Sequence, residues 1–337
     1  MPYTQVANLD FNEIKTTLKE YLRAQSDFTD YDFEGSTLSI LLDTLAYNTY
    51  YTAFNTNLVV NELFIDSATL RDNVVAIAKQ LGYRPKSATS PTAYVSFTVT
   101  YSNPTTDTEL LLKKGTGFTA TYENRLFNYV VLEDVKAQVA NGVATFSDVA
   151  INEGTQLTNT FTVNSASKSQ RFVLDNQNID TNTISVRVYP TGGSFNEPYL
   201  VADNILGVDA TSKVFFLDEI EDERYEILMG DGVLGKKLEN NARIEVSYLV
   251  TSGPESNGVR TFTFSGVLEN PDGVSPSSFT IALNSIVAAA GGEEIESTKK
   301  IKNTAPKAYG TQDRAVTAQD YEAIVRKVYP ATSDIII

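Results

Sequence analysis

The sequence predicts an α+β protein, with an N-terminal helical module followed by mostly antiparallel β-domains and a short α/β C-terminal part. Before residue 82, apolar residues recur at the spacing of helices, and after Pro91 apolar and polar residues alternate as they do in strands. A clear helix start then returns at Thr317. We expect a helical module over residues 1–90, a β-rich region over residues 91–260 that can divide near residue 150, and a mixed domain over residues 261–337.

The length and charge of the chain limit the kinds of partner that it can have. At 337 residues the chain is long enough for more than one hydrophobic core. Its 27 Lys and Arg residues stand against 42 Asp and Glu residues, a formal charge of −15. Such a surface repels phosphate backbones, so no nucleic-acid partner is expected. No apolar run approaches the ~18 residues that cross a bilayer, so we expect no membrane insertion.

Two absent residue types limit the chemistry. The chain contains no His and no Cys. Their absence excludes Ser-His-Asp and Cys-His catalysis, His-ligated and thiolate-ligated metals, and disulfides. An enzyme built from this chain would have to work with carboxylates, Lys, Tyr or a hard cation.

A first helix is predicted to begin after Asp10. Asp10 is a suitable N-cap, Glu13 can complete a capping box, and Leu9 can form a hydrophobic staple with Ile14. The expected buried side consists of Ile14, Leu18, Tyr21 and Leu22.

A second helix over residues 37–58 carries apolar residues on more than one face, so it needs cover on several sides. Its tyrosines combine a large contact area with a polar tip, which suits protein interfaces. They either pack inside the N-terminal bundle or contact partner chains. The interface candidates are Tyr47, Tyr50, Tyr51, Phe54 and Leu58.

A third helix is predicted to begin at Ser67, with Asp66 as its N-cap and Ile65 and Leu70 as a staple across it. Its apolar stripe consists of Leu70, Val74, Ile77, Ala78 and Leu81. Gly82 is placed to end the helix in a left-handed conformation, and Pro85 prevents it from resuming. A strand then follows, with Val95, Phe97 and Val99 on one side.

Residues 92–250 predict antiparallel strands separated by turns rich in Asn, Asp, Gly and Ser. Gly230, Asp231 and Gly232 form a turn between two strands, and Gly258 lies in a later loop. The glycines are not followed by a GxxxxGK[ST] pattern or a helix, which argues against a phosphate loop. Asp231 is interpreted as a turn residue and not as a calcium ligand, because the pattern of a calcium-binding loop is missing.

The C-terminal part predicts a strand over residues 280–287 that ends at Gly291, then a short helix in which Glu296 can pair with Lys300 and which stops before Pro306. The next helix has Thr317 as its N-cap and Asp320 as its third residue. Because the chain stops at Ile337 in what looks like a new strand, we expect it to be the N-terminal portion of a longer protein.

Three stretches, residues 62–93, 225–258 and 291–330, resemble in this order the baseplate J-like family of contractile injection machines. Within that family they are most similar to the wedge subunits of large contractile-tailed phages, which form the inner baseplate ring. The similarity extends over about residues 1 to 335. It assigns folding and interface roles to Asp66, Leu70, Arg71, Leu81, Gly230, Asp231, Gly232, Gly258, Arg314, Thr317, Asp320 and Tyr321.

The resemblance implies a structural virion protein of the tail baseplate, assembled in the host cytoplasm, with no catalytic residues, cofactor or metal. It implies a homodimer within each wedge and a ring of six wedges around a central hub. Helical segments would contact a second wedge protein, and the ring would support the sheath-initiating subunit. Such a ring would pass on the conformational change that triggers sheath contraction.

Two other functions fit parts of the sequence. The acidic run over residues 218–223 could supply the two carboxylates of a glycoside hydrolase, but we interpret it as a solvated acidic loop, because a cluster of consecutive acids supplies no cleft by itself. A β-rich tail adhesin fits the composition but leaves the N-terminal helices and the helix at Thr317 unexplained.

Overall fold

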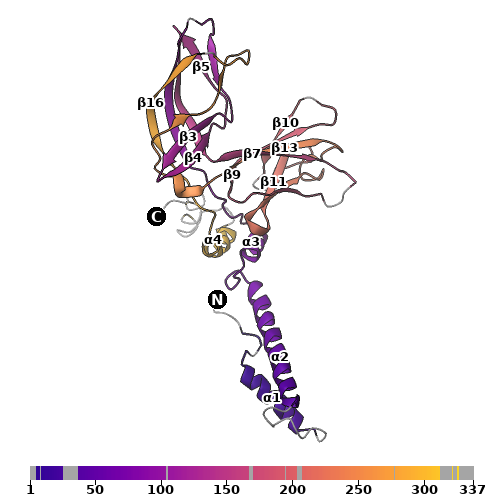
Figure 1. Cartoon of the computed structure of the whole chain (residues 1–337). Helices are drawn as coiled ribbons and strands as arrows, with labels where there is room; N and C mark the ends of the chain where they lie inside the picture. Colours follow the sequence, from indigo (N-terminus) through magenta and orange to yellow (C-terminus); the bar gives the residue numbers. More distant parts are fainter. Residues whose placement is uncertain are drawn as a thin grey trace. The chain divides into compact units, whose positions relative to one another are not determined.

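The computed structural model describes residues 5–7, 9–25, 37–103, 105–166, 170–193, 195–202, 207–276, 278–311, 321 and 325 (Figure 1). The chain divides into two compact units. Unit 1 combines residues 1–84 with residues 297–337, and unit 2 comprises residues 85–296. The predicted α+β class, with helices first and mostly antiparallel strands after them, is confirmed. The domain boundaries predicted at residues 90 and 260 stay predictions.

Unit 1 is helical. Its helices are α1 (Phe11–Arg23), α2 (Thr37–Glu62), α3 (Arg71–Gln80) and α4 (Thr298–Thr311). Helix α1 packs on α2, and α3 packs on α4 around a small apolar core that includes Val74, Ala78, Ile301 and Ala305.

The predicted start of α1 is confirmed. Asp10 Oδ1 accepts hydrogen bonds from the backbone N–H groups of Asn12 (2.8 Å) and Glu13 (3.1 Å), which satisfies two of the donors left free at a helix start. The predicted buried side is wrong for Tyr21, which is exposed. Helix α1 contains no fully buried residue among those described, and α2 is the helix that it packs on.

The predicted start of α3 is wrong. The helix begins at Arg71 with Leu70 as its N-cap, so Asp66 does not cap it. Leu70 is 57% exposed and forms no staple, whereas Ile65 packs against the apolar core. Leu81 is half-buried against this core. Gly82 has the predicted left-handed conformation, with φ +74°.

Helix α4 was predicted to stop before Pro306, and this is also wrong, since Pro306 lies inside it. A proline inside a helix removes one hydrogen bond and bends the axis. Here Ile301 and Ala305, both buried against the α3 side of the core, stabilise the turn before it. Glu296 lies before the first residue of this helix and is buried, and its Oε2 accepts from the N–H of Lys86 (3.0 Å). Arg314, Thr317 and Asp320 lie outside the described residues, and Tyr321 is helical and exposed.

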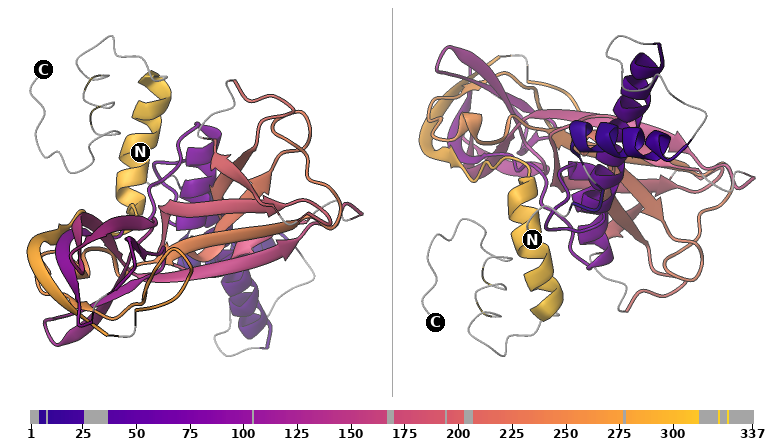
Figure 2. Two further views of the ribbon diagram at one scale, coloured as in Figure 1. Left: turned by 90° about the horizontal axis from the view of Figure 1, so that it is seen from above. Right: turned by 90° about the horizontal axis from the view of Figure 1, so that it is seen from below.

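Unit 2 contains two sheets, which occupy separate parts of the unit in both views of Figure 2. The first has nine strands, ordered β14-β3-β4-β6-β5-β2-β15, with β1 paired to β6 and β16. The bounds are β1 Thr92–Tyr101, β2 Glu109–Leu112, β3 Gly117–Tyr122, β4 Arg125–Val130, β5 Val135–Ala140, β6 Val143–Glu153, β14 Thr263–Phe264, β15 Leu268–Glu269 and β16 Phe279–Ala290.

The first sheet encloses a core of aromatic and branched side chains. Val95, Phe97 and Val99 of β1 are fully buried, as the period of two predicted. The Phe97 ring stacks on Phe146 of β6 with centroids 4.8 Å apart. Strand β1 pairs with β16 from Thr92 to Tyr101, so this core depends on segments nearly two hundred residues apart in the sequence.

The second sheet has seven strands, ordered β7-β13-β9-β10-β11-β12-β8, and only β10 and β11 run parallel among its described pairs. The bounds are β7 Thr155–Thr162, β8 Phe172–Leu174, β9 Ile179–Tyr189, β10 Glu197–Val201, β11 Val214–Glu219, β12 Tyr225–Met229 and β13 Arg243–Val250. Two short 3-10 helices, η1 (Glu221–Glu223) and η2 (Gly253–Ser256), follow β11 and β13.

Candidate interaction surface

Helix α2 presents the candidate interface. Its 26 residues span about 39 Å at 1.5 Å per residue. One face is buried and, apart from Leu42, carries small or polar residues: Ser39, Ala46, Ala53, Asn57 and Asn61. The small side chains of Ala46 and Ala53 allow a close approach, and α1 packs along this helix. One face of α2 is therefore covered within the chain itself.

Asn57 fixes the N-terminal segment to this face. Its Oδ1 accepts from the N–H groups of Val6 (2.7 Å) and Ala7 (2.9 Å), and its Nδ2 donates to the carbonyl of Ala7 (2.9 Å). Asn57 is fully buried, so leaving its side-chain amide unpaired would be costly. No pattern in the sequence pointed to this residue.

A second face of α2 carries an apolar stripe that the described residues leave mostly exposed. We define the α2 stripe as Ile40, Tyr47, Tyr51, Phe54 and Leu58, whose spacing of seven, four, three and four residues places them along one side of a helix. Tyr47, Tyr51 and Phe54 are 55%, 47% and 42% exposed, and Ile40 is also exposed. Leu58 is half-buried. A row of large apolar side chains in water is unusual for a helix without a partner.

The two exposed tyrosines of the stripe organise each other. The Tyr47 hydroxyl donates to the Tyr51 hydroxyl (3.1 Å), and their rings meet edge to face with centroids 4.7 Å apart. The hydrogen bond to Tyr51 raises the pKa of Tyr47, because losing the proton would break that bond. Tyr50 is half-buried, with its ring 6.0 Å from that of Tyr51. Tyr47, Tyr51 and Phe54 are exposed in the part of the chain that the structure describes, and their role as an interface stays a prediction.

Glu62, at the end of α2, caps the start of α3. Its Oε1 accepts from the Thr69 N–H (2.7 Å) and hydroxyl (2.5 Å), and its Oε2 accepts from the Leu70 N–H (3.2 Å) and Asn73 Nδ2 (2.9 Å). Burial alone would raise the pKa of Glu62, but these hydrogen bonds outweigh it and lower the pKa to about 2. This carboxylate takes the place that the sequence pattern gave to Asp66 and joins α2 to α3.

The glycine motif is a turn, as predicted. Asp231 Oδ1 accepts from the N–H groups of Val233 (2.8 Å) and Leu234 (2.9 Å), which closes the turn. Gly230 lies so close to Gly235 that an added Cβ would be 2.3 Å from the Gly235 carbonyl carbon. Gly232 and Gly258 both have positive φ values. The residues serve the fold of the loop, and the interface role that the resemblance assigned to them stays a prediction.

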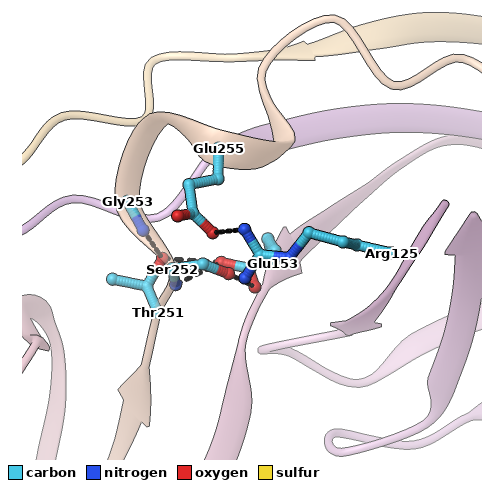
Figure 3. A network of polar contacts seen from close by, with 6 residues as sticks. All are labelled: Arg125, Glu153, Thr251, Ser252, Gly253 and Glu255. Atoms are coloured by element: carbon cyan, nitrogen blue, oxygen red, sulfur yellow. Dashed lines mark hydrogen bonds and ion pairs between the residues drawn. The ribbon is translucent and has the colours of Figure 1, made fainter. Parts of the chain in front are cut away.

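A polar network joins the two sheets of unit 2 where the chain passes from β6 to β7 (Figure 3). Glu153 is buried, and its Oε2 accepts from the Thr251 hydroxyl (2.7 Å) and the Ser252 N–H (3.0 Å), while its Oε1 accepts from the Ser252 hydroxyl. Above it, Arg125 forms an ion pair with Glu255 (2.5 Å). Both oxygens of Glu153 are thus occupied by protein donors, an arrangement that suits structure more than proton transfer.

Two small cavities lie beside carboxylates of unit 2. One of about 290 Å³ lies beside Glu153, and one of about 310 Å³ lies beside Asp107. Neither is lined by the acidic run over residues 218–223, whose Glu221 and Asp222 are exposed on a short turn. Among the described residues no group of three or more carboxylates could hold a metal ion, and no helix combines the length and apolar character of a membrane span.

Comparison with known proteins gives matches in both sequence and structure. Residues 10–83, which contain the α2 stripe and Glu62, match the family described as baseplate wedge protein gp6-like, helical domain. The chain is 29% identical over 333 residues to baseplate wedge protein gp6 of Enterobacteria phage T4, a match that covers 94% of this chain and 49% of the relative. The chain therefore spans about half the length of that relative. Both sequence matches support the baseplate wedge family.

A solved structure, the six-fold symmetrised cryo-EM structure of the anti-feeding prophage baseplate, aligns with 97% of this chain and 66% of the matched chain. The identity is 12% and the TM-score is 0.29, which is too low to carry an argument.

Proposed function

We propose that this chain is a structural, non-catalytic subunit of a contractile phage tail baseplate, a wedge protein that forms part of the inner baseplate ring. The observation that carries the proposal is the coincidence of two findings on one segment. Residues 10–83 match the helical domain of baseplate wedge proteins, and the same residues expose the α2 stripe to water. A stripe of this kind is suited to contact with another helix.

The finer parts of the proposal concern partners. The chain would form a homodimer within each wedge, contact a second wedge protein through helices, and join a six-fold ring around the central hub that supports the sheath-initiating subunit. It would belong to the wider baseplate J-like family and be located in the virion tail. These statements extend the sequence resemblance, and the exposed helical surface supports them.

The mechanism would be mechanical. A ring held together by many interfaces can have two discrete packings, and a signal from the tail fibres of the phage would shift the balance between them. A rigid subunit transmits a change of packing to its neighbours better than a flexible one. The tight packing of Glu153 between the sheets and of Glu62 between α2 and α3 suits this role.

The test is co-expression with the neighbouring wedge proteins, followed by light scattering. Replacing Tyr47, Tyr51 and Phe54 together by Ala should leave the melting temperature nearly unchanged, because the three side chains are largely exposed. The same variant should lose the higher-mass complex, because its contact surface is gone. The matched control replaces Thr52 and Thr56, exposed residues on another face of the same helix, by Ala. Complexes of wild-type mass in the triple variant would refute the role of the stripe.

No specific observation supports either alternative function. The carboxylates of residues 218–223 line neither of the two cavities described above, so neither cavity brings two of them to a substrate. A β-rich adhesin would leave the helical unit and its match to wedge proteins without a role.

A further inference from the structure

The seven-stranded sheet has β7 at one edge, where β13 is its one paired strand among the described residues. This strand, residues 155–162, reads TQLTNTFT and contains no charged residue, no Pro and no Gly. It pairs with β13 over its whole length without a bulge. Natural edge strands usually carry a charge, a Pro or a bulge, because an uninterrupted edge pairs readily with a further strand. The edge of β7 has none of these features.

The backbone groups on the free side of β7 belong to its even-numbered residues. In an antiparallel pair, alternate residues direct both of their backbone groups toward the same neighbour. Val163, directly after β7, directs both toward the β13 side, since its N–H donates to the carbonyl of Ala242 (2.8 Å) and its carbonyl accepts from the N–H of Asn241 (2.8 Å). The odd-numbered residues of β7 therefore bond to β13. Thr158 and Thr160 direct their N–H and carbonyl groups to the edge.

Contacts within the chain limit this edge at both of its ends. At the start, the N–H of Gly154 donates to the carbonyl of Asn128 (2.9 Å), which holds β4 beside the first residues of the strand. At the end, Gln170 Nε2 donates to the carbonyl of Thr162 (2.6 Å). The middle of the strand, around Asn159, has no backbone partner on this side among the described residues.

The side chains of β7 are arranged nearly symmetrically about Asn159. Leu157 and Phe161 lie on the inner face, where they are half-buried against the core of the sheet. Thr158 and Thr160 lie on the other face and are exposed. In both directions from Asn159 the chain thus has a Thr at one residue's distance and a large apolar residue at two. A strand of this kind, placed antiparallel to a copy of itself, brings similar side chains together.

We propose that β7 pairs antiparallel with β7 of a second copy of this chain, with the two Asn159 residues opposite each other on a two-fold axis. Thr158 then lies opposite Thr160 of the other copy, and each such pair exchanges both of its backbone hydrogen bonds. Leu157 lies opposite Phe161, which covers apolar surface that each strand alone leaves in water. A two-fold axis perpendicular to the strands makes each strand antiparallel to its copy, so a single kind of chain is sufficient for this contact.

Charge also favours a second copy at this edge. Each chain carries a net charge of −15, so two copies repel each other wherever their carboxylates meet, and β7 brings no charged side chain of its own to the contact. An edge of 8 residues is smaller than the interface of a stable dimer, so we expect the pairing where other contacts hold two copies together. In this respect the inference rests on the proposed function, whose homodimer within each wedge brings the copies together.

Because the chain has no Cys, introduced thiols report on this pairing directly. The variants Thr158→Cys and Thr160→Cys are expressed with the neighbouring wedge proteins, each alone and both together, and the assembled baseplates are oxidised. The Cα atoms of a hydrogen-bonded pair are about 5.5 Å apart, within the range of a disulfide. Two copies of position 158 are about 8 Å apart, beyond that range. We expect roughly tenfold more disulfide-linked dimer of this chain from the mixed baseplates than from either variant alone.

The matched control combines Thr121→Cys with Thr145→Cys, at exposed threonines of β3 and β6 in the other sheet, and should give little linked dimer. Hydrogen exchange of the unmodified chain is a second measurement that needs no variant. The backbone amides of Thr158 and Thr160 should exchange roughly tenfold more slowly in the baseplate than in the free chain, because pairing removes them from water.

The outcomes separate this inference from the proposed function. If the chain is in the baseplate but the two amides exchange as fast as in the free chain, the edge is unpaired and the inference is wrong. Slow exchange without the mixed disulfide would mean that a strand of another protein occupies the edge. Linkage of Thr158→Cys to itself would mean a different register or direction of pairing. Either result overturns the inference while the proposed function stands. If the chain is absent from the baseplate, the proposed function fails, and this inference fails with it.

Discussion

At the scale of single residues, carboxylates stabilise the joints of this protein. Asp10 directly precedes the first helix and caps it. Glu62 caps α3 across a longer stretch, because it accepts from the N–H of Leu70, eight residues later in the chain. Glu153 performs a comparable role between the sheets, about one hundred residues from Thr251. Each of these groups receives several donors, so each is worth more than an exposed ion pair.

Replacing Glu62 by Gln should lower the free energy of unfolding by roughly 1–2 kcal/mol at neutral pH, as the loss of a helix cap does. The pH dependence gives a second measure. The folded-state pKa of about 2 lies below the ordinary value of 4.5, so the contribution of this carboxylate is present above pH 4.5 and is lost as the pH falls toward 2. Urea titrations at several pH values check both effects. In the control Glu20→Gln, on the exposed side of α1, both should be nearly absent.

The features that the sequence predicted correctly are those set by contacts between residues close together in the chain. The cap of α1, the left-handed Gly82 and the alternation in β1 all depend on residues within a few positions, and all three are present in the structure. The cap of α3 depends on a side chain from the preceding helix, which no spacing rule connects to Asp66 or Leu70. The sequence also showed that α2 is apolar on several sides, but which side α1 covers depends on Ala46, Ala53 and the contacts of Asn57.

At the scale of elements, the pairing of α3 with α4 decides which residues stabilise unit 1. Ile301 is fully buried, and Leu70 is largely exposed. Replacing Ile301 by Ala should therefore cost on the order of 2–5 kcal/mol, through lost burial and the remaining cavity. The matched substitution Leu70→Ala should stay within about 0.5 kcal/mol of the wild type. Thermal unfolding of both variants checks this, and equal losses would show that the buried side of α3 has been assigned wrongly.

At the scale of the whole molecule, unit 2 is closed by contacts between its two ends. Thr89 and Glu293 exchange backbone hydrogen bonds (2.9 and 3.1 Å), and β16 pairs with β1 along its length. No local pattern in the sequence indicates pairing at this separation, which is why the predicted boundaries at residues 90 and 260 divide β1 from β16.

A fragment of residues 85–296 should therefore fold alone, with a β-type circular dichroism spectrum and one cooperative unfolding transition. A fragment of residues 91–260 lacks β16 and should expose the core around Phe97 and Phe146, so we expect it to aggregate or to unfold over a broad range. Comparing the two fragments also tests the boundaries predicted from the sequence. If the shorter one proved equally cooperative, the domain division would follow those boundaries.

The most direct measurement of the proposed role is a cryo-EM map of the assembled tail that contains this chain. We predict six-fold copies in the inner ring of the baseplate, with Tyr47, Tyr51 and Phe54 of α2 covered by helices of another chain. A tail that lacks the chain, or one in which the α2 stripe faces solvent in every copy, would contradict this role.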